Sequence, residues 1–325
     1  MTKRTIYILI LMQVLSSACG KGVEQTGRDG GDPSQEYDGG PVTLTVATCN
    51  VLKPEGRCEE MSMSSSVVRK ALARSIAQTN GDVIAFNELD ETLIRAGKYS
   101  LPAACSYMKD MDWRLEWPND IHEYTPLSYS YSNGFAFNSA KLKLEESGYV
   151  WLSKEEETWY VKPSSAYLKA GSPERTCIWA RMTHIASGKE FWLFVTHLPT
   201  QSQGGSDNMA GVLNAFAAHK AGSAPAILTG DMNSALGSAT YRRLIGYWKD
   251  DNIEATWGTQ SGSSSNYYYT AEVFTRNHPE RRIDHIMTRG CTATDYRTIV
   301  VTYTVDGQEW CPSDHLPVVA TITIN

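Results

Sequence analysis

Four acidic side chains of this 325-residue chain adjoin apolar segments typical of buried strands: Glu88, Asp231, Asp284 and Asp314. One acid at a strand end is commonly a turn residue, but four are harder to explain in that way. Buried carboxylates repel one another unless a cation or a proton holds them together. The chain shows no CxxC spacing and no clustered histidines. The oxygen ligands therefore favour a hard divalent cation: Mg²⁺, Mn²⁺ or Ca²⁺.

Two histidines occupy the same kind of position. His197 lies at the end of the apolar segment "FWLFVTHL", and His315 directly follows Asp314 in "CPSDHLPVV". A neighbouring carboxylate fixes the orientation of an imidazole and favours its charged form. Hydrolysis of a phosphate ester needs one group to activate water and another to protonate the leaving oxygen. One histidine alone is best explained as a hydrogen-bonded core residue, but two beside these acids favour acid–base chemistry on a phosphate ester.

These side chains can lie close together only if the polar ends of several strands lie at the same edge of the fold. Apolar segments predict strands at 42–52, 82–89, 133–138, 148–153, 176–182, 190–198, 225–233, 281–289, 297–305 and 316–324. Helices are predicted at 66–79, before Asn80-Gly81, and at 207–221, before Gly222. Strand ends are rigid, so polar groups there can share one cleft. Strands that are apolar on both faces need covering layers, which predicts two packed sheets flanked by helices.

The first 41 residues differ in composition from the rest. Lys3 and Arg4 precede the apolar run "IYILILMQVL", which is too short to span a bilayer, and "SSAC" follows, so residues 1–18 are predicted to be a signal peptide. Cys19 then predicts lipid attachment as in bacterial lipoproteins, although Ser16 departs from the usual leucine; ordinary cleavage beside an incidental cysteine is the alternative. Residues 19–41 are rich in Gly and Asp and predict a flexible tether.

Residues 42–325 are expected to form one domain. Nine Trp, 17 Tyr and 42% hydrophobic residues in the whole chain supply a full core, and no second linker or internal repeat interrupts the segment. We expect the protein to be exported, held at the membrane by the lipid on Cys19, and monomeric.

Export would permit disulfide bonds among the cysteines that follow Cys19. Cys58 with Cys105 and Cys291 with Cys311 lie in loop-like contexts and are the two candidate pairs. Cys49 and Cys177 lie within strand patterns and are expected to be buried thiols. Spacing alone does not fix the pairing.

Six short motifs occur in the order seen in the endonuclease/exonuclease/phosphatase superfamily, which includes deoxyribonuclease I and bacterial sphingomyelinases. They are "TCN", "AFNELD", "VTHL", "TGDMNS", "RRIDHIM" and "SDHLPV", and "ERTCIWARM" resembles a block of secreted bacterial members. The chain resembles this superfamily over residues 42–325. The resemblance implies an α+β fold, a four-layer α/β/β/α sandwich of two mainly antiparallel sheets between helices. It also implies a divalent-metal-dependent phosphoester hydrolase of the phosphodiesterase or nuclease type.

The resemblance implies a role for each motif residue. Glu88 resembles the principal metal ligand, and Asn50 and Asp314 would complete the metal site, directly or through water. Mg²⁺ is the expected ion, with Mn²⁺ or Ca²⁺ as alternatives. Asp231 resembles the acid that orients or deprotonates the attacking water.

The remaining motif residues resemble groups that contact the phosphate. Asn233 would bind the scissile phosphate. His315 would stabilise it while held by Asp284, or would act as the base. His197 resembles a histidine that serves as an acid or a phosphate ligand, and Arg175 would add positive charge near the phosphate.

Three positions depart from the superfamily pattern. Asn87 stands where Gln is usual and is too short to be assured of the same partner. No Arg follows His197 on the next predicted helix, which puts a substrate contact in doubt. His285 replaces the commoner Tyr, and we interpret it as structural.

The substrate class stays open at the level of sequence. The formal net charge is −6 and becomes −8 when residues 1–18, with Lys3 and Arg4, are removed. A protein that binds long nucleic acid usually has a surplus of basic residues, although a local patch would suffice. The alternatives are a nuclease, a phosphatase or phospholipase-type enzyme on small-molecule or lipid phosphoesters, and a non-catalytic binding domain. The acidic charge and aromatic stretches such as "NYYYT" favour the second over the first, and ordinary core and loop packing is the alternative explanation of these aromatic residues.

Overall fold

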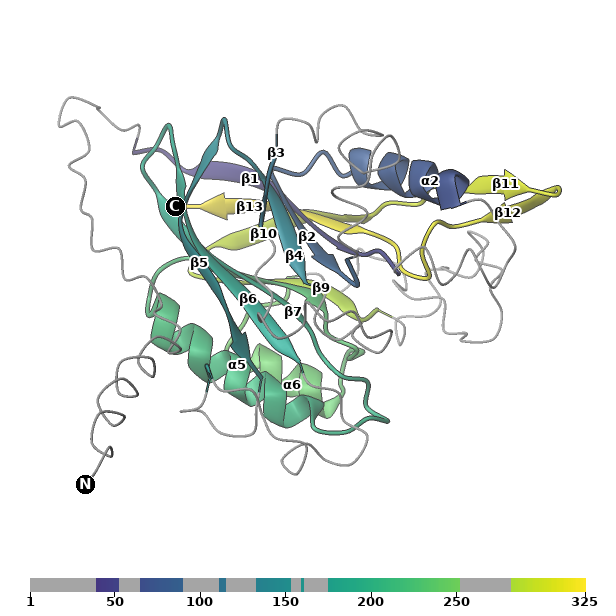
Figure 1. Cartoon of the computed structure of the whole chain (residues 1–325). Helices are drawn as coiled ribbons and strands as arrows, with labels where there is room; N and C mark the ends of the chain where they lie inside the picture. The colour runs from purple at the N-terminus through teal and green to yellow at the C-terminus, as the bar shows by residue number, and fades with distance from the viewer. Residues whose placement is uncertain are drawn as a thin grey trace, which may run out of the picture. The chain divides into compact units, whose positions relative to one another are not determined.

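Two β-sheets form the framework of the protein in the computed structural model (Figure 1). The structure describes residues 39–52, 65–89, 111–114, 133–152, 159–160, 175–251 and 282–325. In the six-stranded sheet the order is β10 (Thr292–Thr298), β13 (Val318–Ile324), β1 (Val42–Asn50), β2 (Val83–Asn87), β4 (Gly134–Asn138) and β3 (Met111–Arg114). In the five-stranded sheet the order is β5 (Leu142–Trp151), β6 (Thr176–His184), β7 (Glu190–His197), β8 (Ala226–Asp231) and β9 (Asp284–Arg289).

Each of these sheets contains one parallel pair. Strands β1 and β2 are parallel in the first sheet and β7 and β8 in the second, and the other neighbouring pairs are antiparallel. Parallel strands end at the same edge of a sheet. Asn50 is therefore in register with Asn87, and His197 with Asp231.

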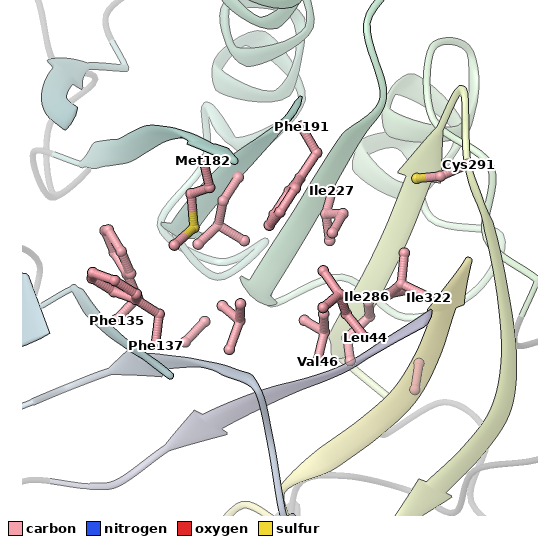
Figure 2. Close-up of a cluster of buried hydrophobic side chains, with 14 of the residues drawn as sticks. Leu44, Val46, Phe135, Phe137, Met182, Phe191, Ile227, Ile286, Cys291 and Ile322 are labelled. Carbon is pink, nitrogen blue, oxygen red and sulfur yellow. The ribbon is translucent and has the colours of Figure 1, made fainter. Parts of the chain in front are cut away.

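Apolar side chains from both sheets fill the space between them (Figure 2). Successive residues of a strand point to opposite faces. In β1, Leu44 and Val46 accordingly face this inter-sheet core, whereas Ala47 and Cys49 face the outer layer. Both faces of β1 are buried from Val46 to Asn50, whereas Thr43 is exposed and Thr45 is partly exposed.

Helices cover the outer faces of both sheets. Helix α2 (Ser65–Ala77) packs Leu72 and Ile76 against Ile84 and Phe86 of β2. Helices α5 (Ser206–Ala221) and α6 (Ala239–Ile245) cover the five-stranded sheet, with Phe216 packed against Phe194. The four-layer α/β/β/α sandwich with mainly antiparallel sheets is thus confirmed.

The segment predicted as one strand at 297–305 is not continuous. Strand β10 ends at Thr298, and β11 (Tyr303–Val305) pairs with β12 (Gln308–Trp310) in a separate hairpin. Between them Ile299 and Val301 are buried against the outer face of the six-stranded sheet. The segment is apolar because it is buried, without being part of a strand. The short elements α6 and β3 were not predicted.

The predicted disulfide between Cys291 and Cys311 is wrong. No disulfide bond joins these two cysteines. Cys291 points into the inter-sheet core, as Figure 2 shows, whereas Cys311 packs with Leu316 in a different apolar cluster. Cys58 and Cys105 lie outside the described residues.

The other two cysteines behave as expected. Cys49 in β1 and Cys177 in β6 are buried free thiols, and burial raises the pKa of each. In the part of the chain that the structure describes, no helix is long and apolar enough to cross a membrane. The predicted signal peptide and most of the predicted tether fall in residues 1–38, outside that part.

The inter-sheet core should dominate stability. Ile227 of β8 is fully buried in it (Figure 2). We expect Ile227→Ala to lower the free energy of unfolding by about 2–5 kcal/mol, because it removes buried apolar contacts and leaves a cavity. Urea denaturation would measure this. Ile185→Ala is the matched control, since Ile185 is 41% exposed. Equal effects of the two substitutions would contradict the assigned core.

Candidate active site

Polar side chains from both sheets meet where the two parallel pairs end. Strand β9 begins at this edge, because Asp284 is in register with Asp231. The loop before β13 adds Asp314 and His315, and Arg175 directly precedes β6. Contacts and charge effects link the predicted site residues into one group: Asn50, Glu88, Arg175, His197, Asp231, Asn233, Asp284, Asp314 and His315.

The carboxylate of Asp231 lies at the centre of this group. Its Oδ2 atom is 3.1 Å from Nδ2 of Asn50, 3.3 Å from Nε2 of His197 and 3.7 Å from Nε2 of His315. Its Oδ1 atom accepts a hydrogen bond from the backbone N–H of Asn233 at 2.8 Å. Burial raises the pKa of Asp231 to about 7, with a further rise from Asp284 and an opposing effect from His315.

His315 is held between acids. Its Nδ1 atom lies 2.7 Å from Oδ2 of Asp284. Burial alone disfavours the charged ring, but Asp284, Asp314 and Asp231 outweigh it and raise the pKa of His315 well above its usual value. The raised pKa favours the imidazolium at neutral pH, with Nδ1 facing Asp284 and Nε2 3.7 Å from Oδ2 of Asp231. This cation makes the closeness of Asp231 and Asp284 tolerable.

Ser313 fixes the loop that carries His315, a role that the sequence reasoning missed. Its hydroxyl donates to the backbone O of Asn50 at 2.8 Å and accepts from the backbone N–H of His315 at 3.1 Å. The loop is thereby tied to the end of β1. A serine two residues before a loop histidine is a turn-forming signal that could have indicated this role.

Glu88 and Asp314 form a second pair of acids, both partly exposed. Burial and the charge of Asp314 raise the pKa of Glu88, whereas Asn50, His315 and Arg175 lower it. Oδ1 of Asp314 is buried and has no hydrogen-bond partner among the described residues. Two repelling carboxylates with an unpartnered oxygen fit a hard divalent cation.

Asn50 connects this pair of acids to the centre of the site. Its Nδ2 group donates to Oε1 of Glu88 and to Oδ2 of Asp231, each at 3.1 Å, and its Oδ1 accepts from the backbone N–H of Leu52. Glu88 itself has φ +53°, a left-handed conformation that costs about 1–3 kcal/mol in a residue other than glycine. The fold holds Glu88 in this position despite the strain.

A different group of possible ligand atoms also lies close together. Atoms of Asp231, Asp284 and His315 are within 4.8 Å of one another. The imidazolium of His315 places one positive charge between these two carboxylates, with Nδ1 2.7 Å from Asp284 and Nε2 3.7 Å from Asp231. Their proximity therefore has an explanation without an ion, so Glu88, Asp314 and Asn50 fit a cation better.

The two histidines have opposite charge states. Burial, followed by the charges of Arg175 and His315, lowers the pKa of His197 well below its usual value. His197 is therefore neutral. Its Nδ1 atom is buried and without a hydrogen-bond partner among the residues the structure describes. Arg175 is itself buried, and its charge lowers the pKa of both His197 and Glu88.

Asn233 belongs to the candidate site, whereas His285 supports it from the protein interior. Asn233 is partly exposed, has φ +46°, and donates one side-chain N–H to the backbone O of Leu198 at 2.7 Å. His285 is buried, with Nδ1 3.2 Å from Oδ2 of Asp250 and Nε2 3.1 Å from the backbone O of Ser234. These contacts agree with the interpretation of His285 as structural.

Comparison with known families identifies this arrangement. The model of the Endonuclease/Exonuclease/phosphatase family matches residues 47–315, which include every site residue named above. The chain belongs to this family. A comparison with curated proteins returned no match.

Several solved structures share the fold. An endonuclease/exonuclease/phosphatase family protein from Bacteroides thetaiotaomicron is 20% identical, with a TM-score of 0.66 over 89% of this chain and 97% of that one. The mannosyl-6-phosphatase of the same species is 20% identical, with a TM-score of 0.64 over 86% and 99%. D. rerio TDP2, complexed with a single-strand DNA product, is 19% identical, with a TM-score of 0.53 over 86% and 98%.

The pairing of His315 with Asp284 can be tested directly. Asp284→Asn keeps the side-chain shape and removes the nearest anion, so the imidazolium becomes less favourable and the pKa of His315 should fall. A pH titration of the His315 ring proton by NMR, in metal-free protein, would measure the change. Asp295→Asn, an exposed site on β10, is the matched control and should leave the titration unchanged. An unaltered His315 titration in Asp284→Asn would contradict the pairing.

Proposed function

We propose that the protein is a divalent-metal-dependent phosphoester hydrolase in which water attacks phosphorus in line. The observation that carries the proposal is the position of Asp231. Its buried carboxylate lies among Asn50, His197 and His315, which come from three separate segments of the chain. A structural carboxylate in a core does not require two histidines and a neighbouring pair of acids.

Glu88, Asp314 and Asn50 would hold the ion, with Mg²⁺ expected and Mn²⁺ or Ca²⁺ as alternatives. When bound, the ion neutralises charge on the nonbridging oxygens of the phosphate. Asp231 would orient the attacking water and accept its proton. A pKa raised to about 7 suits a general base near neutral pH.

The remaining groups would stabilise the developing charge. Asn233 and Arg175 would bind the phosphate, and His315 would stay charged beside it while Asp284 holds its ring. His197 is neutral in the free protein, so it would act first as a phosphate ligand through its Nε2 side, which faces the site beside Asp231. Such preorganised electrostatic stabilisation is usually the largest catalytic contribution.

A phosphodiester is the proposed substrate class, of the kind that nucleases and phosphodiesterases hydrolyse. The structural similarity to TDP2 with bound DNA product supports it. A phosphatase or phospholipase-type activity on small-molecule or lipid phosphoesters is the second candidate. The net charge of −6 and the similarity to a mannosyl-6-phosphatase favour that alternative.

We expect Glu88→Gln and His315→Ala each to lower kcat by ~10²–10³, because each removes charge stabilisation from the transition state. Hydrolysis of bis-p-nitrophenyl phosphate with Mg²⁺ would measure this, and EDTA should abolish the wild-type activity. Glu190→Gln, an exposed glutamate on β7, is the matched control and should retain wild-type turnover. Circular dichroism should show normal folding of all three variants. Near-normal turnover of Glu88→Gln or of His315→Ala would reject the role of that residue.

A substrate screen separates the candidate functions. The wild-type protein would be assayed on DNA, RNA, phosphoinositides, sphingomyelin and sugar phosphates, with Mg²⁺ and with EDTA. Metal-dependent cleavage of nucleic acid supports the first candidate, and cleavage confined to sugar or lipid phosphates supports the second. Inactivity toward every substrate, bis-p-nitrophenyl phosphate included, would reject the hydrolase and leave a binding domain.

A further inference from the structure

Asn87, the last residue of β2, makes contacts across the sandwich that its departure from the usual Gln did not suggest. Its Oδ1 accepts a hydrogen bond from the backbone N–H of Asp231 at 2.8 Å. Its Nδ2 donates to the backbone O of Thr196 at 3.0 Å and to Oδ1 of Asn133 at 2.8 Å. The side chain is fully buried, so each contact replaces one with water. One carboxamide of the six-stranded sheet thus reaches β7 and β8 of the other.

Asn133 extends and orients this contact. It lies directly before β4 and donates from Nδ2 to the backbone O of Thr176 in β6 at 3.2 Å. Its Oδ1 faces Nδ2 of Asn87, and the N–H of Asp231 faces Oδ1 of Asn87. Turning the carboxamide of Asn87 around would set donor against donor and acceptor against acceptor, so only one orientation satisfies every group. We name Asn87 and Asn133 together the amide clamp.

Backbone geometry at the clamp supports a fixed distance. Gly230 in β8 has φ +140°, and a Cβ there would lie 1.9 Å from the backbone O of Thr196 and 3.2 Å from Oδ1 of Asn87. Only glycine permits this close approach. A side chain at position 230 would collide with Thr196 and crowd Oδ1 of Asn87, so glycine here lets the Asn87 carboxamide reach β7 and β8.

Each contact of the clamp adjoins a residue of the candidate site. Asn87 precedes Glu88, Thr196 precedes His197, and Asp231 is bound through its own backbone. One half of the site, Asn50 with Glu88, belongs to the six-stranded sheet. The other half, with His197 and Asp231, belongs to the five-stranded sheet.

We propose that Asn87, oriented by Asn133, is a positioning residue that fixes the separation of these two halves. As a catalytic statement this rests on the proposed function. Loss of the clamp should leave substrate contacts in place but displace Asp231 from Glu88. A misplacement of about 1 Å can cost ~10²-fold in rate.

The test uses Asn87→Ala, Asn133→Ala and the double variant. With bis-p-nitrophenyl phosphate and Mg²⁺, kcat should fall by ~10²-fold in Asn87→Ala while KM stays within about twofold. The kcat of the double variant should equal that of the less active single variant, because the two carboxamides act as a unit. In metal-free protein, hydrogen exchange of the Asp231 amide should become faster in Asn87→Ala relative to that of Leu228 in the same strand.

Asn214→Ala is the matched control. The carboxamide of Asn214 also joins two elements, donating to the backbone O of Arg243 at 2.8 Å and accepting from Nε1 of Trp248 at 3.0 Å, away from the site. It should lower the unfolding midpoint without changing kcat or Asp231 exchange. If Asn87→Ala does not fold, Asn133→Ala carries the same kinetic and exchange readouts.

Two results would overturn the clamp: a kcat of Asn87→Ala equal to that of Asn214→Ala, or rate losses that multiply in the double variant. A wild-type protein inactive on every phosphoester would instead refute the proposed function. In that case the hydrogen exchange rate of the Asp231 amide tests the amide clamp by itself. Faster exchange in Asn87→Ala supports it, and unchanged exchange overturns it.

Discussion

Four carboxylates and two histidines share a small, largely buried volume, and their mutual repulsion is the constraint on which the site depends. The structure meets it in two ways. An imidazolium, His315, lies between Asp284 and Asp231. The carboxamide of Asn50 donates to both Glu88 and Asp231. What these groups leave unsatisfied is Asp314, whose buried oxygen has no partner among the described residues. A divalent ion would supply the positive partner that this oxygen lacks.

The strand order brings these groups together. Each large sheet is antiparallel except for one pair, and both parallel pairs end at the site. A parallel pair places two carboxyl ends side by side, which an antiparallel hairpin does not. Asn50 and Asn87 meet in this way in one sheet, and His197 and Asp231 in the other. The antiparallel strands contribute apolar side chains to the inter-sheet core. This core holds the ends of the two parallel pairs next to each other.

The predicted elements succeeded where an apolar run also ended in a polar residue, as at Asn50, Asn87 and Asp231. At these positions the buried apolar segment is also a paired strand, so the apolar pattern predicts the strand correctly. They failed where burial alone made a segment apolar, as at residues 299–302 between β10 and β11. The short helix α6 has too few turns to show a periodicity, and its start depends on the Ser238 hydroxyl accepting the N–H of Tyr241.

The sequence by itself determined the family, the layered architecture and the chemical types gathered at the site, because these follow from local apolar patterns and short motifs. Only the tertiary structure decided which groups touch. It separated Cys291 from Cys311, gave the two histidines opposite charge states, and joined Asn87 to Asp231 across 144 positions of the chain. Such distances and charges arise from the packing of remote segments, and no local pattern of residues encodes them.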